Sequence, residues 1–463
     1  MRIEQDSMGG MEVPDEALYG ASTQRAVLNF PVSGRTMPEP LLRTLALIKL
    51  ACAQANEELG LLPAEKAARI REVAGEIWEG KLLDHFPVDV FQTGSGTSTN
   101  MNMNEVIANR CNQLVGEPLG SKRLFHPNDD VNMSQSSNDV MPTALHVSLA
   151  LALQKQLHPA LCHLGEALRR QANAFVAIVK PGRTHLMDAV PLTLGQEFSG
   201  YAEQAFKAAA RALKARDALA ELAIGGTAVG TGLNCPPGFP ARVCHILAGK
   251  SGLTLREATN HFEAQAARDD AVEVSGHLAT ICASLMKVAN DIRLLASGPR
   301  TGLGEIRLPV TQPGSSIMPG KVNPVMCEML IQVAIHVQGL CHAVTMAGGA
   351  GQLELNATVP LIALELHEAA ECLSNAVRIF ADTCVAGIEA DEDQCRRGVE
   401  RSLMSVTALV PEIGYDKAAE IAKQALQSNR TLAEVAREAG LKADVIATAL
   451  DPAALIGKRG SPL

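Results

Sequence analysis

Long apolar stripes with helical spacing dominate the middle of this chain. In residues 271–296 the stripe advances by alternating steps of four and three, at Val274, Leu278, Ile281, Leu285, Val288, Ile292 and Leu295. Residues 362–380 repeat this pattern, and from Leu145 to Leu168 leucines recur mostly every four residues. These periods are typical of long packed helices. The sequence therefore predicts an elongated helical bundle with a kink at Pro159.

The composition fits such a bundle and indicates how it packs. Aromatic residues make up only 3% of the chain while hydrophobic residues make up 47%, so the core must consist mainly of Ala, Leu, Val and Ile. Residues 197–220 are rich in alanine, which permits close approach of helices. Convincing alternating strand patterns are few. Because the stripes are broad and the bundle is long, we expect apolar surface that self-association would cover.

The chain has 463 residues, which is too many for one ordinary globular core. We predict a mostly α protein with three domains. An N-terminal mixed, mostly helical domain is expected at residues 1–136, the long-helix bundle at 137–390, and a small helical domain at 391–463.

Charge and cysteine content exclude several classes of protein. The net charge of −9 argues against a nucleic-acid partner. The first 20 residues carry early acids and no apolar core, unlike a secretory signal. No run approaches the roughly 18 uncharged apolar residues of a membrane span. The 11 scattered cysteines form no CxxC pair, which argues against a disulfide framework or zinc site and favours a reducing cytoplasm.

Five polar segments interrupt the helical pattern and share a richness in Gly, Ser, Thr, Asn and His. They are residues 92–105, 126–139, 182–197, 225–234 and 314–324. Backbone N–H groups and short hydroxyl or amide donors at helix N-termini suit a small polyanion such as a dicarboxylate. For any single segment, helix capping and turn formation are the more common explanation, but five together favour a shared site. The glycine runs match neither a P-loop nor a dinucleotide fingerprint.

Two of these segments contain candidates for catalysis. His185 lies beside Thr184 in a donor-rich stretch, where general acid/base work competes with a structural role. The segment GSSIMPGKVNP, 314–324, has one charge, Lys321, and an apolar middle, Ile317 and Met318, that we expect to be covered. Glu328 follows in a helix expected to begin near Pro324, and could orient a histidine.

At this point the residues match a known family. GSSIMPGKVNP resembles the signature of the fumarase/aspartase superfamily, and the other segments match it in the same order along nearly the whole chain. TGSGT, HPNDD, SQSSND and GRTHL resemble the class II fumarate hydratases, whereas AGQLELNATVP at 350–360 is more similar to aspartases. The resemblance implies three mostly α domains. It also implies a homotetramer with a twenty-helix core and active sites shared by three subunits.

The resemblance also implies a reaction and a set of residues. The reaction is the reversible hydration of fumarate to L-malate in the tricarboxylic acid cycle, through an aci-carboxylate intermediate and without metal or organic cofactor. The implied catalytic residues are Ser315 as base, His185 on the acid side, Glu328 orienting it, and Lys321 as a charge. The implied substrate-binding residues are Ser95, Thr97, Ser136, Ser137, Asn138, Thr184 and Asn323. A second anion site would use Arg123, His126, Asn128 and Asp129, although Asn128 or Asp129 could equally be helix caps.

Two alternatives stay open. An aspartate ammonia-lyase has the same fold and intermediate, and His185 argues against it because aspartases carry glutamine there. A non-catalytic structural protein of the same fold predicts the loss of Ser315, His185 or Lys321, and all three are present.

Overall fold

The computed structural model describes residues 1–314, 317–318, 320–452 and 454–456. Its internal contacts divide the chain into two compact units. Unit 1 comprises Met1–Pro159, Ala210–Cys282 and Ile335–Leu373, and unit 2 comprises Ala160–Ala209, Ala283–Ala334 and Ser374–Leu463. Each unit thus draws on three separate stretches, and the three-domain division at residues 136 and 390 stays a prediction.

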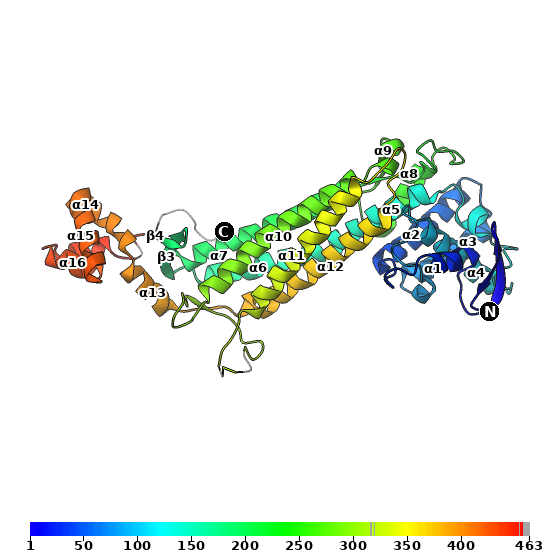
Figure 1. Ribbon diagram of the computed structural model, residues 1–463. Coiled ribbons are helices and arrows are strands. Elements are labelled where there is room, and N and C mark those ends of the chain that lie inside the picture. The colour runs from blue at the N-terminus through cyan, green and yellow to red at the C-terminus, as the bar shows by residue number, and fades with distance from the viewer. Residues whose placement is uncertain (315–316, 319, 453, 457–463) are drawn as a thin grey trace. The chain divides into compact units, whose positions relative to one another are not determined.

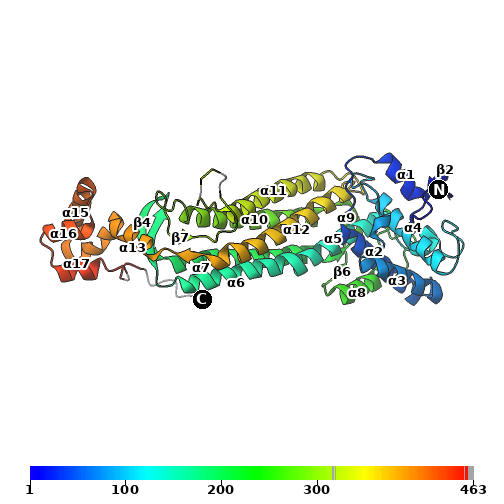
Figure 2. The same cartoon turned by 90° about the horizontal axis from the view of Figure 1, so that it is seen from below.

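The predicted long helices are present. They are α6 (His158–Ala174), α7 (Leu194–Ala218), α10 (Asp269–Leu295), α11 (Val325–Gly348) and α12 (Val359–Thr383). Within unit 2 their segments lie side by side in both views (Figures 1 and 2). All seven stripe positions of residues 271–296 are at most 4% exposed, and the stripes that begin at Leu145 and Ile362 are equally buried. The heptad-like prediction is therefore confirmed.

The disturbance predicted at Pro159 takes the form of a π-helical turn. Helix α5 (Ser137–Ala152) continues into η3 (Leu153–Leu157), which is π-helical, before α6 begins at His158. A proline ring clashes with the carbonyl four residues earlier, here that of Lys155, which lies inside η3. The wider turn accommodates this clash without ending the helical path.

Unit 1 contains most of the N-terminal half of the chain. Its shorter elements are β1 (Arg2–Asp6), β2 (Gly9–Val13), α1 (Ala21–Asn29), α2 (Glu39–Glu58), α3 (Ala64–Trp78), η1 (Leu83–His85), α4 (Thr97–Leu114), η2 (Pro127–Val131), β5 (Glu221–Leu222), α8 (Phe239–Ser251), β6 (Arg256–Glu257) and α9 (His261–Ala266). β1 and β2 pair antiparallel from Arg2↔Val13 to Asp6↔Gly9, while β5 and β6 are parallel.

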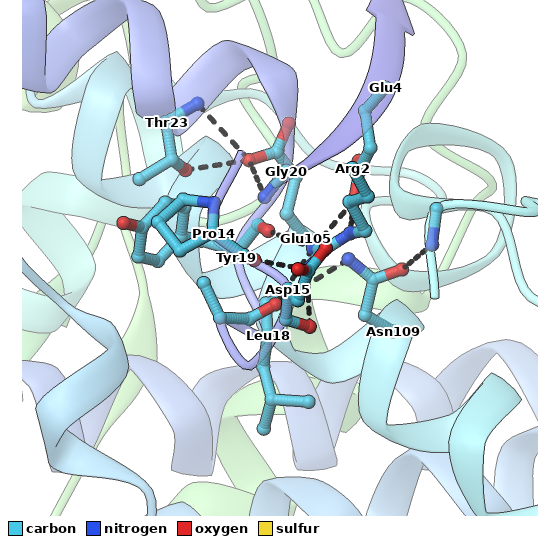
Figure 3. Close-up of polar contacts among 12 residues, drawn as sticks. Arg2, Glu4, Pro14, Asp15, Leu18, Tyr19, Gly20, Thr23, Glu105 and Asn109 are labelled. Atoms are coloured by element: carbon cyan, nitrogen blue, oxygen red, sulfur yellow. Dashed lines mark hydrogen bonds and ion pairs between the residues drawn. The ribbon is translucent and has the colours of Figure 1, made fainter. Parts of the chain in front are cut away.

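Glu105, the last residue of the first polar segment, has a structural role. Its buried carboxylate accepts hydrogen bonds from the backbone N–H of Gly20 at 2.8 Å and of Thr23 at 3.1 Å, and from the Thr23 hydroxyl at 2.6 Å (Figure 3). These are donors at the start of α1, whose N-cap residue, Gly20, has no capping side chain of its own. A carboxylate from α4 thus satisfies the first turn of α1.

Unit 2 contains the C-terminal helices and two small sheets. Its shorter elements are β3 (Val179–Thr184), β4 (Met187–Thr193), β7 (Ile306–Arg307), η4 (Val385–Gly387), β8 (Glu389–Ala390), α13 (Glu392–Arg401), η5 (Leu403–Leu409), α14 (Val410–Ile413), α15 (Tyr415–Ser428), α16 (Leu432–Glu438) and α17 (Ala443–Ala449). The last helices pack around a core of their own that includes Leu409, Ile421 and Val435.

The segment at residues 182–197, expected to be a polar loop, is mostly a β-hairpin. β3 and β4 pair antiparallel with a bulge between Pro181 and Gly182, and α7 begins at Leu194. The turn residues His185 and Leu186 both have positive φ, +56° and +62°, as a two-residue primed hairpin turn requires. Such turns normally contain Asn or Gly, so His-Leu gave no hairpin signal.

Helix α11 corrects the statement that no segment approaches a membrane span. Within the described residues, Val325–Gly348 is the one helix long and apolar enough to cross a bilayer by length and composition. Only 28% of its most apolar window is buried in this chain. Ile335 and Met346 are 57% and 67% exposed on it.

Candidate active site

Three of the five polar segments meet in unit 1 through hydrogen bonds of hydroxyl and amide side chains. The Thr97 hydroxyl lies 2.8 Å from that of Ser95 and 2.7 Å from that of Ser137. Thr97 begins α4 and Ser137 begins α5, so two helix N-termini adjoin. Asn138 donates from its amide to the carbonyl of Ala228 at 2.9 Å, which brings in the segment at 225–234. Four of the residues predicted to bind substrate, Ser95, Thr97, Ser137 and Asn138, are thus neighbours in unit 1, and their role stays a prediction.

Ser136 caps α5. Its hydroxyl accepts from the N–H of Asn138 at 3.2 Å, and Asp139 accepts from the N–H of Ser136 at 2.9 Å, forming a capping box. The capping interpretation therefore holds for this residue. It does not exclude substrate binding, because a capped helix N-terminus still presents partial positive charge.

Asp139 links two polar segments and was not predicted from the sequence. Its buried second oxygen accepts from the N–H groups of Gly225 and Thr227, each at 3.0 Å. Burial raises the pKa of this carboxyl to about 6, against the lowering effect of the backbone hydrogen bonds. The Ser-x-x-Asp spacing could have indicated the capping box but not the second pair of bonds.

The aspartase-like segment at 350–360 packs against the first polar segment. The N–H of Val359 donates to the carbonyl of Gly94 at 3.0 Å. A Cβ on Gly94 would lie 1.8 Å from the carbonyl oxygen of Ala357, so only glycine fits there. Residues 350–360 therefore lie directly against Gly94, the residue before Ser95.

The catalytic candidates that the structure describes lie in unit 2. Thr184 and His185 are exposed at the end of the β3–β4 hairpin. Lys321 is exposed, and Glu328 is exposed in the first turn of α11, which begins at Val325 as predicted. Within the described part of the chain, no hydrogen bond or ion pair joins Glu328 to His185. Their pairing stays a prediction.

Gly314 and residues 321–323, at the two ends of the predicted catalytic segment, lie close together. The Asn323 amide donates to the carbonyl of Gly314 at 2.6 Å, and a Cβ on Gly314 would lie 2.1 Å from the carbonyl oxygen of Lys321. Ile317 and Met318 are 85% and 52% exposed, so the expectation that they are covered is wrong for the single chain. Ser315, predicted as the base, lies outside the described residues.

A buried ion-pair network holds the hairpin and was missed by sequence reasoning. Lys180 on β3, 1% exposed, places Nζ 3.0 Å from Glu197 and 3.2 Å from Glu305. Arg183, two residues before His185, pairs with the other oxygen of Glu305 at 2.6 Å. Glu305 is 2% exposed, and its backbone carbonyl accepts from the N–H of Asp391 at 2.9 Å. The network thereby fixes the strand that leads to His185.

The proposed second anion site lies at η2. The His126 Nδ1 accepts from the N–H groups of Asn128 at 3.3 Å and Asp129 at 3.1 Å. The cap of η2 is therefore the side chain of His126. The alternative that Asn128 or Asp129 is the helix cap is wrong. Arg123 is 72% exposed and lies 3.6 Å from Glu117. Arg123 precedes the N-cap of η2 by three residues. An anion site formed by these residues stays a prediction.

The described residues contain no group of three or more His, Cys, Asp or Glu side chains that could hold a metal ion. The 11 cysteines are all free thiols, most of them buried.

Comparisons with known proteins agree along the length of the chain. The family model described as Lyase matches residues 9–339, and the model described as Fumarase C C-terminus matches residues 406–457. A class II fumarate hydratase of Thermosynechococcus vestitus is 53% identical over 439 residues, which cover 95% of this chain and 94% of that protein. One of Mycobacterium tuberculosis is 53% identical over 444 residues, covering 96% of this chain and 92% of the relative.

Solved structures give the same result. A recombinant class II fumarase from Schistosoma mansoni is 40% identical, with a TM-score of 0.94 and coverage of 97% of this chain and 98% of the other. A fumarate lyase:delta crystallin from Brucella melitensis, bound to cobalt, is 46% identical, with a TM-score of 0.96 and coverage of 98% and 99%. The chain therefore belongs to the lyase family and, within it, to the class II fumarate hydratases.

Proposed function

We propose that this protein catalyses the reversible hydration of fumarate to L-malate, as in the tricarboxylic acid cycle. The observation that carries the proposal is the 53% identity over 95% of the chain to a class II fumarate hydratase. The hydroxyl cluster around Thr97 and the exposed His185 and Lys321 fit that activity. Eleven free thiols fit a reducing compartment, and we infer a cytoplasmic location.

The proposed mechanism places the main demand on a carbanion-like intermediate. From malate, Ser315 removes the C3 proton as an alkoxide, and the electrons move into the adjoining carboxylate. Hydroxide then leaves C2 with a proton from His185. Because charge develops on the carboxylate, preorganised donors and a nearby cation matter most. Lys321 supplies that cation, while Ser315 and its role rest on the family resemblance.

We infer that residues of different subunits bind the substrate carboxylates. Ser95, Thr97 and the Ser136–Asn138 stretch offer donors from unit 1, and Thr184 and Asn323 offer donors from unit 2. We infer that each site is completed by different subunits of a homotetramer. The exposed apolar face of α11 supports this, since a helix with only 28% of its apolar window buried needs a partner surface.

Ile335→Asp tests the assembly. Ile335 is 57% exposed on α11, so the change should fold as a chain but place a charge in the apolar interface. We expect analytical ultracentrifugation to show species smaller than a tetramer. Leu426→Asp, at a 70% exposed position on α15, is the control and should leave the tetramer intact. A tetrameric Ile335→Asp protein would contradict the role of this face.

Lys321→Ala tests the charge argument. Losing a charge-assisted hydrogen bond to a carboxylate should raise the KM for malate about tenfold or more. Steady-state kinetics would measure this, with Lys250→Ala as control because Lys250 is exposed on α8 and carries the same charge. Unchanged KM and kcat in Lys321→Ala would remove it from substrate binding.

The function itself is tested by following the ultraviolet absorbance of fumarate with purified protein. L-malate and L-aspartate would be supplied in separate cuvettes. Fumarate from malate alone supports the hydratase. Fumarate from aspartate would mean that the segment at 350–360 outweighs His185 and that the protein is an ammonia-lyase. No fumarate from either would contradict both activities and favour the non-catalytic alternative.

A further inference from the structure

A fully buried lysine contacts the turn that precedes α5 in unit 1. Lys49, in the middle of α2, is a charged residue among buried apolar neighbours along the helix, and it is 0% exposed. Its Nζ donates to the side-chain oxygens of Asn132 and Gln135, both at 2.9 Å. A buried ammonium is costly unless paired, and here its direct partners are two neutral amides. Burying an ammonium against two neutral amides lowers the stability of the fold, so stability does not explain why a lysine is found at this position.

The two amides belong to the turn that precedes α5. The Asn132 oxygen also accepts from the Asn100 amide on α4 at 3.3 Å, and the Gln135 amide donates to the carbonyl of Met133 at 3.0 Å. Asn56, two turns further along α2, donates to the same carbonyl at 3.1 Å. The turn is thus held from α2 at two points and from α4 at one. Ser136, Ser137 and Asn138 follow it directly.

We propose that Lys49 is a positioning residue that, in its protonated form, holds the turn at 132–135 and the adjoining Ser136–Asn138 donors in the conformation that binds a dicarboxylate. The inference rests on the proposed function of those donors. Protonated Lys49 gives both amide oxygens a donor and adds positive potential behind an anion site. When Lys49 is neutral, its amine has one hydrogen-bond donor fewer and no positive charge. The turn at 132–135 is then held less firmly, and the dicarboxylate binds less tightly.

The protonation state of Lys49 changes in an accessible pH range. Burial lowers the pKa of Lys49 to about 7, against the raising effect of the Asp139 carboxylate on α5. Burial raises the pKa of the Cys52 thiol above its ordinary value, so that this neighbour stays neutral. Asp139, with a pKa of about 6, is ionised above that pH and is the charge that opposes the loss of the proton.

The test measures the binding of succinate, a dicarboxylate that the enzyme cannot hydrate, by isothermal titration calorimetry between pH 6 and 9. We expect the wild-type Kd to rise as pH passes about 7. Lys49→Met, which keeps the length of the side chain, should bind about fivefold to tenfold more weakly at the low end and lose this rise. The other titratable groups are present in both proteins, so the comparison isolates Lys49.

Asn132→Asp is the second variant, and it serves if Lys49→Met fails to fold. The aspartate keeps a side-chain oxygen that accepts from Lys49. It loses only the hydrogen bond that the Asn132 amide donates to the carbonyl of Gln135 at 3.3 Å. A carboxylate beside the ammonium should move the rise in Kd to higher pH. A merely structural lysine would leave the pH dependence in place. Wild-type Kd and pH dependence in the folded variants overturn the inference. A wild-type protein that binds succinate but forms no fumarate from malate overturns the proposed function instead.

Discussion

His185→Asn is expected to lower kcat for malate by about 100-fold or more, because a positioned general acid/base contributes about 10²–10⁴-fold. The structure makes asparagine the right replacement. His185 has φ +56° in the hairpin turn, and asparagine tolerates this left-handed backbone better than most residues. The hairpin should therefore keep its conformation, and the loss can be assigned to the imidazole. Steady-state turnover as a function of pH is the measurement.

His245→Asn is the matched control for this change. His245 is exposed on α8, so the same substitution there should leave turnover unchanged. Circular dichroism and sedimentation of His185→Asn should match the wild type. An unaltered pH–rate profile in His185→Asn would remove this residue from the acid/base step and reopen the aspartate ammonia-lyase alternative.

Glu305→Ala is expected to lower the free energy of unfolding by about 3 to 5 kcal/mol, because it removes the buried carboxylate that Lys180 and Arg183 share. Arg183 loses its 2.6 Å contact, and among the described residues Lys180 keeps Glu197 as its one carboxylate partner, besides the carbonyl of Pro181 at 3.2 Å. Both cations lie on β3, which leads into His185, so we also expect lower turnover in the folded fraction. The midpoint of urea unfolding at fixed protein concentration measures the first effect.

Two further variants show whether the lost stability comes from the negative charge of Glu305 or from removal of any carboxylate side chain. Glu305→Gln keeps an acceptor for Arg183 without the charge and should fall between wild type and alanine. Glu389→Ala removes a 76% exposed carboxylate 3.9 Å from Arg307, and should cost no more than about 1 kcal/mol. If Glu305→Ala unfolded at the wild-type urea concentration, the buried network would not hold the hairpin.

Helical periodicity was predictable because it depends on residues three and four apart. Every stripe position of α10 is buried, and α11 begins within one residue of the expected start. The polar segments were predictable as donors, but their local structure was only partly so. Residues 97–105 belong to α4, and 127–131 form the π-helical η2. Ser, Asn and Gly indicate helix N-termini and turns alike, and composition does not separate the two.

The sequence by itself determined the mostly α class, the helix stripes and the family. The tertiary structure decided where the isolated charges are buried and what they contact. Lys49 bonds residues 83 positions away, and Arg183 bonds a residue 122 positions away. Period and propensity act within a few residues, whereas a buried cation is tolerated only where the fold supplies distant oxygens. The positioning of the candidate site is therefore a property of long-range packing that no local pattern records.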